Sequence, residues 1–131
     1  MTIAKILLTL TALFYSLLPP LVDLNLSHAL HPDWVPHARL HLVWLVTTNS
    51  LAGLLAIWLI WRHPGGALIG GAISACVLGG YLIAAAFMPV YGGALSDVVG
   101  SGTAIDILVP GTMFFLNAVG LWLQRLDNIK Q

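Results

Sequence analysis

The residues from 40 to 61 read LHLVWLVTTNSLAGLLAIWLIW, a stretch between Arg39 and Arg62 that contains no charged residue. About 20 apolar residues are enough for a helix to cross the hydrocarbon core of a bilayer. The run is continuous rather than alternating, which favours a helix over a strand, and an open sheet edge cannot lie in lipid. This stretch therefore predicts a membrane-spanning helix.

Three more charge-free stretches lie on either side of it, between Lys5 and Asp23, between Arg62 and Asp97, and between Asp106 and Arg125. From them we place the spans at about 3–22, 38–61, 67–88 and 105–124. The first span has no small-residue cleavage site, so we expect it to be retained rather than removed as a signal peptide. The sequence thus predicts an all-α integral membrane four-helix bundle, with residues 1–131 forming a single transmembrane domain.

The composition excludes most other classes of protein. Apolar residues make up 59% of the 131 residues and charged residues 8%, whereas about a quarter of a typical soluble domain is charged. The lipid bilayer is therefore the expected partner. The formal net charge is zero, so the sequence does not predict a nucleic-acid partner. The single cysteine, Cys76, lies in an apolar run and is expected to be a small packing residue.

The basic residues predict an orientation. In a four-span topology, Lys5, Arg62, Arg125 and Lys130 fall on one side and only Arg39 falls on the other. Basic residues favour the cytoplasmic side, so both termini are expected to be cytoplasmic and the connections at about 24–37 and 89–104 external. We expect a multi-pass protein of the bacterial inner membrane.

Four of the five histidines lie close together after the first span, at His28, His31, His37 and His41. Pro36 fits the first turn of the second helix, so His37 and His41 share one helical face. Imidazoles at that spacing can bind a transition metal, and nearby carboxylates would suit zinc, iron or copper. The glutamate of the zinc-protease helix motif is absent, and with it a general base.

A second polar group continues into the predicted bundle. Asp106 opens the last helix at the expected depth of His41, and an ionisable residue there usually faces the bundle interior. Asn49 and Asn117 lie deeper, at similar depth, where they could form a hydrogen bond across helices and line the floor of a pocket. The expected site comprises Asp23, His28, His37, His41 and Asp106, with a rim of His31, Asp33, Arg39, Tyr81, Tyr91 and Asp97.

Several functions fit these residues, and the sequence does not choose among them. The site could hold a metal ion, or bind and protonate a lipophilic small molecule that enters from the outer leaflet. The same residues could instead form a structural cluster without a ligand, since a histidine with a carboxylate partner can simply fix a loop. A further alternative is a non-catalytic accessory or assembly subunit of a larger membrane complex. No residue is assigned a catalytic role, and whether the chain is an enzyme stays open.

Small residues recur along the third span. Gly71, Ala75 and Gly79 form one row at steps of four, and Gly66, Gly70 and Ser74 form a second row. Such rows let helix backbones approach closely in lipid. We expect them to pack within the bundle, and a homodimer face is the alternative.

The block His31-Pro-Asp-Trp-Val-Pro-His-Ala-Arg-Leu-His41 resembles the signature of a family of short bacterial four-helix membrane proteins. In that family an Asn/His-Pro-x-Trp-x-Pro-His-Ala-Arg-x-His block follows the first span. The resemblance covers the first two spans and implies the architecture but no activity. In size and layout the chain is also similar to DoxX-like proteins and to the sterol-isomerase and sigma-2-receptor proteins, which bind lipophilic ligands. The acidic pair expected in the isomerases is not recognisable here.

Overall fold

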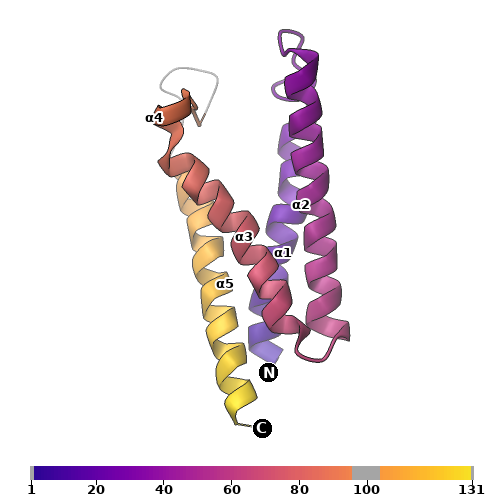
Figure 1. Cartoon of the computed structure of the whole chain (residues 1–131), viewed down its shortest axis with the longest axis vertical. Helices are drawn as coiled ribbons and strands as arrows, with labels where there is room; N and C mark the ends of the chain where they lie inside the picture. The colour runs from indigo at the N-terminus through magenta and orange to yellow at the C-terminus, as the bar shows by residue number, and fades with distance from the viewer. Residues whose placement is uncertain (1, 96–103, 131) are drawn as a thin grey trace.

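Four long helices form most of the chain in the computed structural model, which describes residues 2–95 and 104–130 (Figure 1). They are α1 (Thr2–Asp23), α2 (Pro36–Arg62), α3 (Gly66–Ala86) and α5 (Ile105–Ile129), with the single-turn helix α4 (Met88–Tyr91) between α3 and α5. The described ranges contain no strand. Each of the four long helices is long and apolar enough to cross a membrane. The all-α fold with four candidate spans is therefore confirmed.

Two helix ends differ from the predicted ones. The third span ends at Ala86 rather than 88, and the short helix α4 stands at the start of the connection predicted at about 89–104. The Tyr91 hydroxyl donates to the Ala84 carbonyl at 2.8 Å, and Gly92, with a φ of 70°, ends the turn. Helix α5 continues to Ile129 instead of ending at 124, because charged side chains beyond the apolar stretch do not stop a helix from extending into water.

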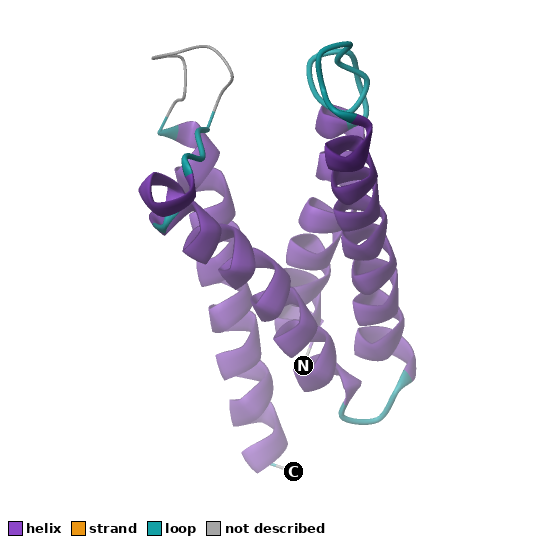
Figure 2. Cartoon of the chain, turned by 45° about the horizontal axis from the view of Figure 1, so that its top comes forward, coloured by secondary structure: helices purple, strands orange, loops and turns teal. Residues whose placement is uncertain are grey.

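The helices form a ring in the order α1, α2, α3, α5. Across the ring α1 and α3 touch, whereas α2 and α5 make no contact. Both termini and the turn at residues 62–66 lie at one end, which we call the closed end, and the loop at residues 24–35 and α4 lie at the other, the open end (Figures 1 and 2). This arrangement makes α1 and α2 one arm of the molecule and α3 and α5 the other.

Small residues bring the helices together in the closed half. A Cβ added to Gly70 would lie 2.7 Å from the carbonyl oxygen of Ala56 in α2, and one added to Gly71 would meet Leu121 of α5. In the same row as Gly71, a Cβ on Gly79 would lie 3.4 Å from Phe114 of α5. These contacts confirm that both rows of small residues in α3 pack within the chain.

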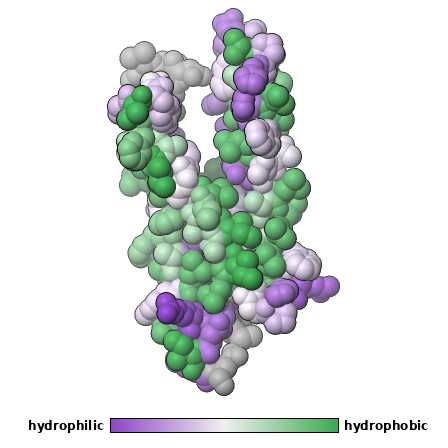
Figure 3. Space-filling view, viewed as in Figure 1, coloured by the Kyte–Doolittle hydropathy of each residue, from purple (hydrophilic) through white to green (hydrophobic). Residues whose placement is uncertain are grey.

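The open half is not closed in the same way. All buried residues of α3 lie between positions 66 and 78, and those of α5 between 117 and 124. A Cβ added to Gly80 or Gly111, in the other halves of these helices, would meet no atom within 4 Å. The space-filling view shows a cleft that passes between the two arms in the open half of the molecule (Figure 3). We refer to it as the cleft.

Pro20 leaves a carbonyl of α1 without its usual helical donor, and a side chain of α2 donates to it instead. Pro20 lacks the N–H that would bond the Ser16 carbonyl four residues earlier. The Ser50 hydroxyl of α2 donates to that carbonyl at 2.8 Å. The freed backbone group is thus satisfied by a neighbouring helix, as an apolar environment requires.

Candidate functional site

The loop at the open end is held by its own polar side chains. The Asn25 side chain donates to the Val22 carbonyl at 2.8 Å and accepts the Ser27 backbone N–H at 2.8 Å. The Ser27 hydroxyl bonds the Asn25 side chain at 2.6 Å and lies 2.9 Å from Nδ1 of His28. Asn25 and Ser27 therefore build a tight turn that places His28 beside the end of α1.

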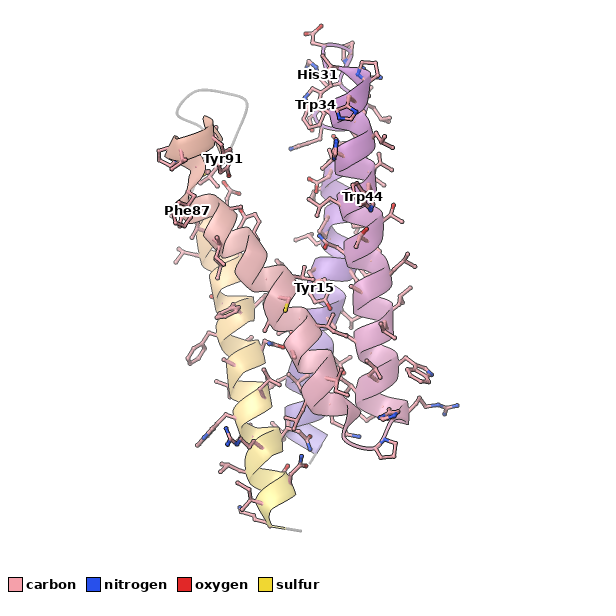
Figure 4. The ribbon with its side chains drawn as sticks, in the orientation of Figure 1. Tyr15, His31, Trp34, Trp44, Phe87 and Tyr91 are labelled. Carbon is pink, nitrogen blue, oxygen red and sulfur yellow. The ribbon has the colours of Figure 1, made fainter. Side chains whose placement is uncertain are left out.

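Arg39 fixes the rest of the loop to the start of α2. Its guanidinium donates to the carbonyl of His31 at 2.6 Å and to that of Pro32 at 3.1 Å. The His31 ring accepts the backbone N–H of Asp33 at 3.2 Å. Figure 4 shows His31 and Trp34 at the tip of this arm. These three predicted rim residues thus shape the loop, while Asp97, another of them, lies outside the described residues.

His37 and His41 form a pair on α2. Their Nε2 atoms lie 3.0 Å apart, and the rings meet edge to face with centroids 4.5 Å apart. A hydrogen bond between these atoms requires one ring to be protonated at Nε2 and the other to be unprotonated there. Both side chains are exposed, and the His41 ring also lies 5.9 Å from that of Trp44. The predicted one-face arrangement of this pair is confirmed.

A different group of residues lies at the mouth of the cleft. The Tyr81 hydroxyl of α3 donates to the backbone carbonyl of Asp106 in α5 at 2.7 Å. Pro110 explains why that carbonyl can accept from another helix, because proline lacks the N–H that would bond it within the helix. Asp106 and Asp23 of α1 both lie within electrostatic range of the Tyr81 hydroxyl. Tyr81 thus joins α3 to α5 directly, and the charge of Asp23 on α1 acts on it through space.

The residues of the expected site lie on helices that are not all neighbours. An electrostatic interaction joins His28 in the loop to Asp23 at the end of α1. His37 and His41 belong to α2, which makes no contact with the helix that carries Asp106. Within residues 2–95 and 104–130, no three histidine, cysteine or acidic side chains come close enough to hold a metal together. A histidine pair and a carboxylate–tyrosine group remain as separate candidate sites.

The expected pairing of the two asparagines is wrong. Asn117 is 1% exposed; its side chain accepts from the Thr11 hydroxyl at 3.2 Å and donates to the Gly71 carbonyl at 2.9 Å. Asn117 therefore joins α5 to α1 and α3 inside the closed packing. Asn49 cannot reach it, because the contact between α1 and α3 separates α2 from α5. The two residues were matched in depth but face different neighbours.

Asn49 instead lies on the wall of the cleft. It precedes Ala56 by seven residues, about two turns, so both lie on one face of α2. On this face a Cβ at Gly53 would meet Ser16 of α1, and the Ala56 carbonyl and Ile60 side chain approach Gly70 of α3, so the face is directed at the space between α1 and α3. Above this contact α3 diverges, and Asn49 is only half-buried. Within the described part of the chain its amide forms no hydrogen bond to another residue.

An apolar layer to which all four long helices contribute closes the base of the cleft. Its buried members are Ala12, Tyr15, Ala56 and Leu78, with Ala52, Met113 and Phe114 among the side chains packed against them. Tyr15 lies near the level at which the arms separate (Figure 4), and its hydroxyl is 3.3 Å from that of Ser74. The cleft thus has an apolar base, a polar group on one wall and a polar mouth.

From the sequence, Tyr81 is expected only at the rim of the site, and Pro110 has no expected role. The available signal was the proline itself, since a proline within an apolar span marks a carbonyl that a neighbouring hydroxyl must satisfy. The other predicted rim tyrosine, Tyr91, bonds back to α3 and so fixes α4 (Figure 4).

Comparisons of the chain with protein-family models, with curated proteins and with solved structures find no match.

Proposed function

We propose that this chain is a multi-pass membrane protein whose cleft binds a lipophilic small molecule through a polar group on that molecule. The observation that carries the proposal is the unpaired amide of Asn49 on the cleft wall. Asn49 lies 13 residues into α2, about 20 Å from its first residue. At that depth in a bilayer there is little water, and an unpaired amide is costly. A ligand with a hydroxyl or carbonyl group would satisfy it.

The walls and mouth of the cleft fit such a ligand. The base is apolar and matches a hydrocarbon body, while the mouth presents Asp23, Asp106 and Tyr81. Pockets for small molecules commonly combine apolar walls with a few polar groups that fix orientation. Since the cleft passes between the arms, a ligand could enter sideways from the lipid. Sterols, terpenoid alcohols and quinones have the required combination of an apolar body and one or two oxygens.

We further propose that the closed end is cytoplasmic and the cleft opens toward the outer face of a bacterial inner membrane. Lys5, Arg62, Arg125 and Lys130 belong to the closed end, and only Arg39 belongs to the open end. This distribution follows the tendency of basic residues to remain in the cytoplasm. Single cysteines introduced at Ser27 and at His63 in a Cys76→Ala protein test it. An impermeant maleimide added to whole spheroplasts should label only the cysteine at position 27.

The ligand proposal is tested by thermal stability in detergent with a sterol, a terpenoid alcohol and a quinone analogue added in turn. A true ligand should raise the midpoint of unfolding of the wild type. The shift should be reduced in Asn49→Leu and in Asp106→Asn. Asp127→Asn is the matched control, since it makes the same change on the same helix near the closed end. That variant should keep the full ligand-induced shift.

Two outcomes would contradict the proposal. The first is that no compound in the panel stabilises the protein and no small molecule is found by mass spectrometry after extraction from membranes. The second is that every variant, Asp127→Asn included, loses the shift equally, which would indicate a general effect of the compound on the micelle. Co-purification of the chain with a larger membrane complex, unaffected by Asn49→Leu, would favour the accessory-subunit alternative instead.

A second candidate function is metal binding at His37 and His41. The observation that favours it is the 3.0 Å separation of the two Nε2 atoms. Two nitrogens each about 2.0–2.1 Å from one zinc ion lie within about 4 Å of each other, so both rings could contact one ion after a small rearrangement. The described residues supply no third ligand, so water or an added ligand would complete the coordination.

Elemental analysis of protein purified without a histidine tag or a chelator tests this second function. Zinc, iron or copper near one ion per chain, lost in His41→Ala and kept in His63→Ala, would support it. His63 is the control because it is an exposed histidine at the opposite end. Metal retained in His41→Ala would place the ion elsewhere.

A further inference from the structure

Two walls of the cleft continue a helix contact that is closed lower down. Near the base, the Ala56 carbonyl and the Ile60 side chain of α2 approach Gly70 of α3. Asn49 precedes these two residues of α2 by seven and eleven positions, and Tyr81 follows Gly70 by eleven, so each lies within about 20° of its contact face. Asn49 and Tyr81 therefore border the cleft from opposite arms, above the level at which α2 and α3 separate (Figure 1).

The two side chains differ in depth. Counted at 1.5 Å per residue, Asn49 lies about 10 Å above Ala56, and Tyr81 lies about 16 Å above Gly70. They are thus about one helical turn apart along the cleft, with the width of the cleft between them. A ligand that meets both side chains needs two polar groups, one deep in the cleft and one at its mouth.

The Tyr81 hydroxyl can accept a hydrogen bond from a ligand but cannot donate one. Its single hydrogen is donated to the Asp106 carbonyl at 2.7 Å, while the phenolic oxygen keeps its acceptor capacity. The residue is 41% exposed, so no other helix covers it. The charges of Asp106 and Asp23 act on this hydroxyl, and ionised carboxylates are acceptors as well. The mouth at Tyr81 therefore favours a ligand hydroxyl over a carbonyl or an ether.

Asn49 accepts a wider range of partners. Its amide has both a donor and an acceptor, and within the described residues neither forms a hydrogen bond to the protein. Either a hydroxyl or a carbonyl oxygen of a ligand would satisfy it. A six-membered ring with oxygens at opposite positions is about as long as one helical turn, which matches the difference in depth.

We propose that the cleft binds a lipophilic hydroquinone, an aromatic ring with two opposite hydroxyl groups and an apolar chain. The outer hydroxyl donates to Tyr81, the inner one pairs with Asn49, and the ring lies above the apolar layer at the base. This inference rests on the proposed function of the cleft and narrows its ligand. A sterol or terpenoid alcohol with one oxygen meets only one of the two side chains, and an oxidised quinone has no donor for Tyr81.

The test compares an alkyl hydroquinone with its own quinone and its dimethyl ether, which keep the ring and chain but have no hydroxyl. The affinity of the full chain for each compound follows from how the unfolding midpoint rises with concentration, measured without oxygen at one detergent concentration. The hydroquinone should bind about tenfold more tightly than either control, because only it supplies the donor. Partition into the micelle would favour the dimethyl ether, which is more apolar.

Two variants locate the preference for the hydroquinone. Tyr81→Phe removes the acceptor and should reduce the tenfold preference to about twofold or less. The preference is a ratio measured within one protein, so a loss of stability in the variant does not affect it. Tyr91→Phe is the matched control, because it removes a hydroxyl that bonds within the α3–α4 segment, and it should keep the full preference. Asn49→Leu should weaken the hydroquinone and the quinone alike.

The outcomes separate this inference from the proposed function. If a terpenoid alcohol with one oxygen binds as tightly as the hydroquinone, the cleft still binds a lipophilic molecule, but the two-group ligand is wrong. A quinone that binds equally well, or a preference that persists in Tyr81→Phe, would overturn the role of Tyr81. Failure of every compound, the sterol and the alcohol included, would overturn the function of the cleft and this inference with it.

Discussion

Replacing Pro110 with alanine should make the hydroxyl of Tyr81 less important for stability. In the native chain the Asp106 carbonyl has no helical partner, because Pro110 has no N–H, and the Tyr81 hydroxyl donates to it at 2.7 Å. An alanine at position 110 would return the missing N–H. The carbonyl would then keep a partner even after the tyrosine hydroxyl is removed.

The expected change in the free energy of unfolding depends on whether residue 110 can donate an N–H to the Asp106 carbonyl. Hydrogen bonds between membrane helices contribute about 0.6 kcal/mol on average and at most about 1.7 kcal/mol. Since Tyr81→Phe removes the hydroxyl that donates to this carbonyl, we expect it to lower the free energy of unfolding by about 1 kcal/mol. In a Pro110→Ala protein the same change should cost about 0.5 kcal/mol. The coupling between the two positions should therefore be about 0.5 kcal/mol.

Reversible unfolding in mixed micelles, followed by far-ultraviolet circular dichroism, measures this coupling in the wild type, the two single variants and the double variant. Tyr91→Phe provides the control, because its hydroxyl bonds the Ala84 carbonyl within the α3–α4 segment. Its effect should simply add to that of Pro110→Ala. If Tyr81→Phe costs the same with and without the proline, the idea that the proline creates the acceptor is wrong.

Four other substitutions test the packing, each by the same unfolding measurement. Gly70→Ala would place a Cβ 2.7 Å from a backbone oxygen of α2 and should lower the free energy of unfolding by about 1–3 kcal/mol. In Gly80→Ala the new Cβ meets no atom within 4 Å, so this change should be neutral or should stabilise the protein by up to about 1 kcal/mol. Asn117→Leu removes two interhelical hydrogen bonds and should cost about 1 kcal/mol or more. Ser50→Ala leaves the Ser16 carbonyl without its donor and should cost about 0.6–1.7 kcal/mol, and equal stability would show that another donor replaces it.

The helices could be predicted from the sequence because charges interrupt the apolar runs. Arg39 and Arg62 lie in the first and last turns of α2. The observed helix, Pro36–Arg62, differs from the predicted span by only a few residues. The positions of charged residues report where the chain leaves the apolar layer. They do not report the angle at which helices cross, so the cleft could not be predicted from them.

The candidate site could be predicted from the sequence only in part. Spacing along a helix correctly paired His37 with His41, since both residues belong to one element. Depth alone matched Asn49 with Asn117, and that failed because depth does not determine which helices are neighbours. Tyr81 joins Asp106 through a backbone carbonyl, an interaction that a search for charged and imidazole side chains does not consider.

Gly70 and Gly80 show how α3 packs tightly in the closed half of the molecule and borders the cleft in the open half. At Gly70 the α2 backbone lies against α3, and the missing side chain allows that approach. At Gly80, ten residues farther along, no atom lies within 4 Å of the position a Cβ would take, so this face of α3 is not covered by another helix, although Gly79 beside it faces Phe114 of α5. Protein interiors are close-packed, and an apolar cleft in a bilayer will be filled by lipid chains or by a ligand. A lipid chain would leave the Asn49 amide unpaired, whereas a ligand with a hydroxyl or carbonyl would not, and this difference favours the ligand.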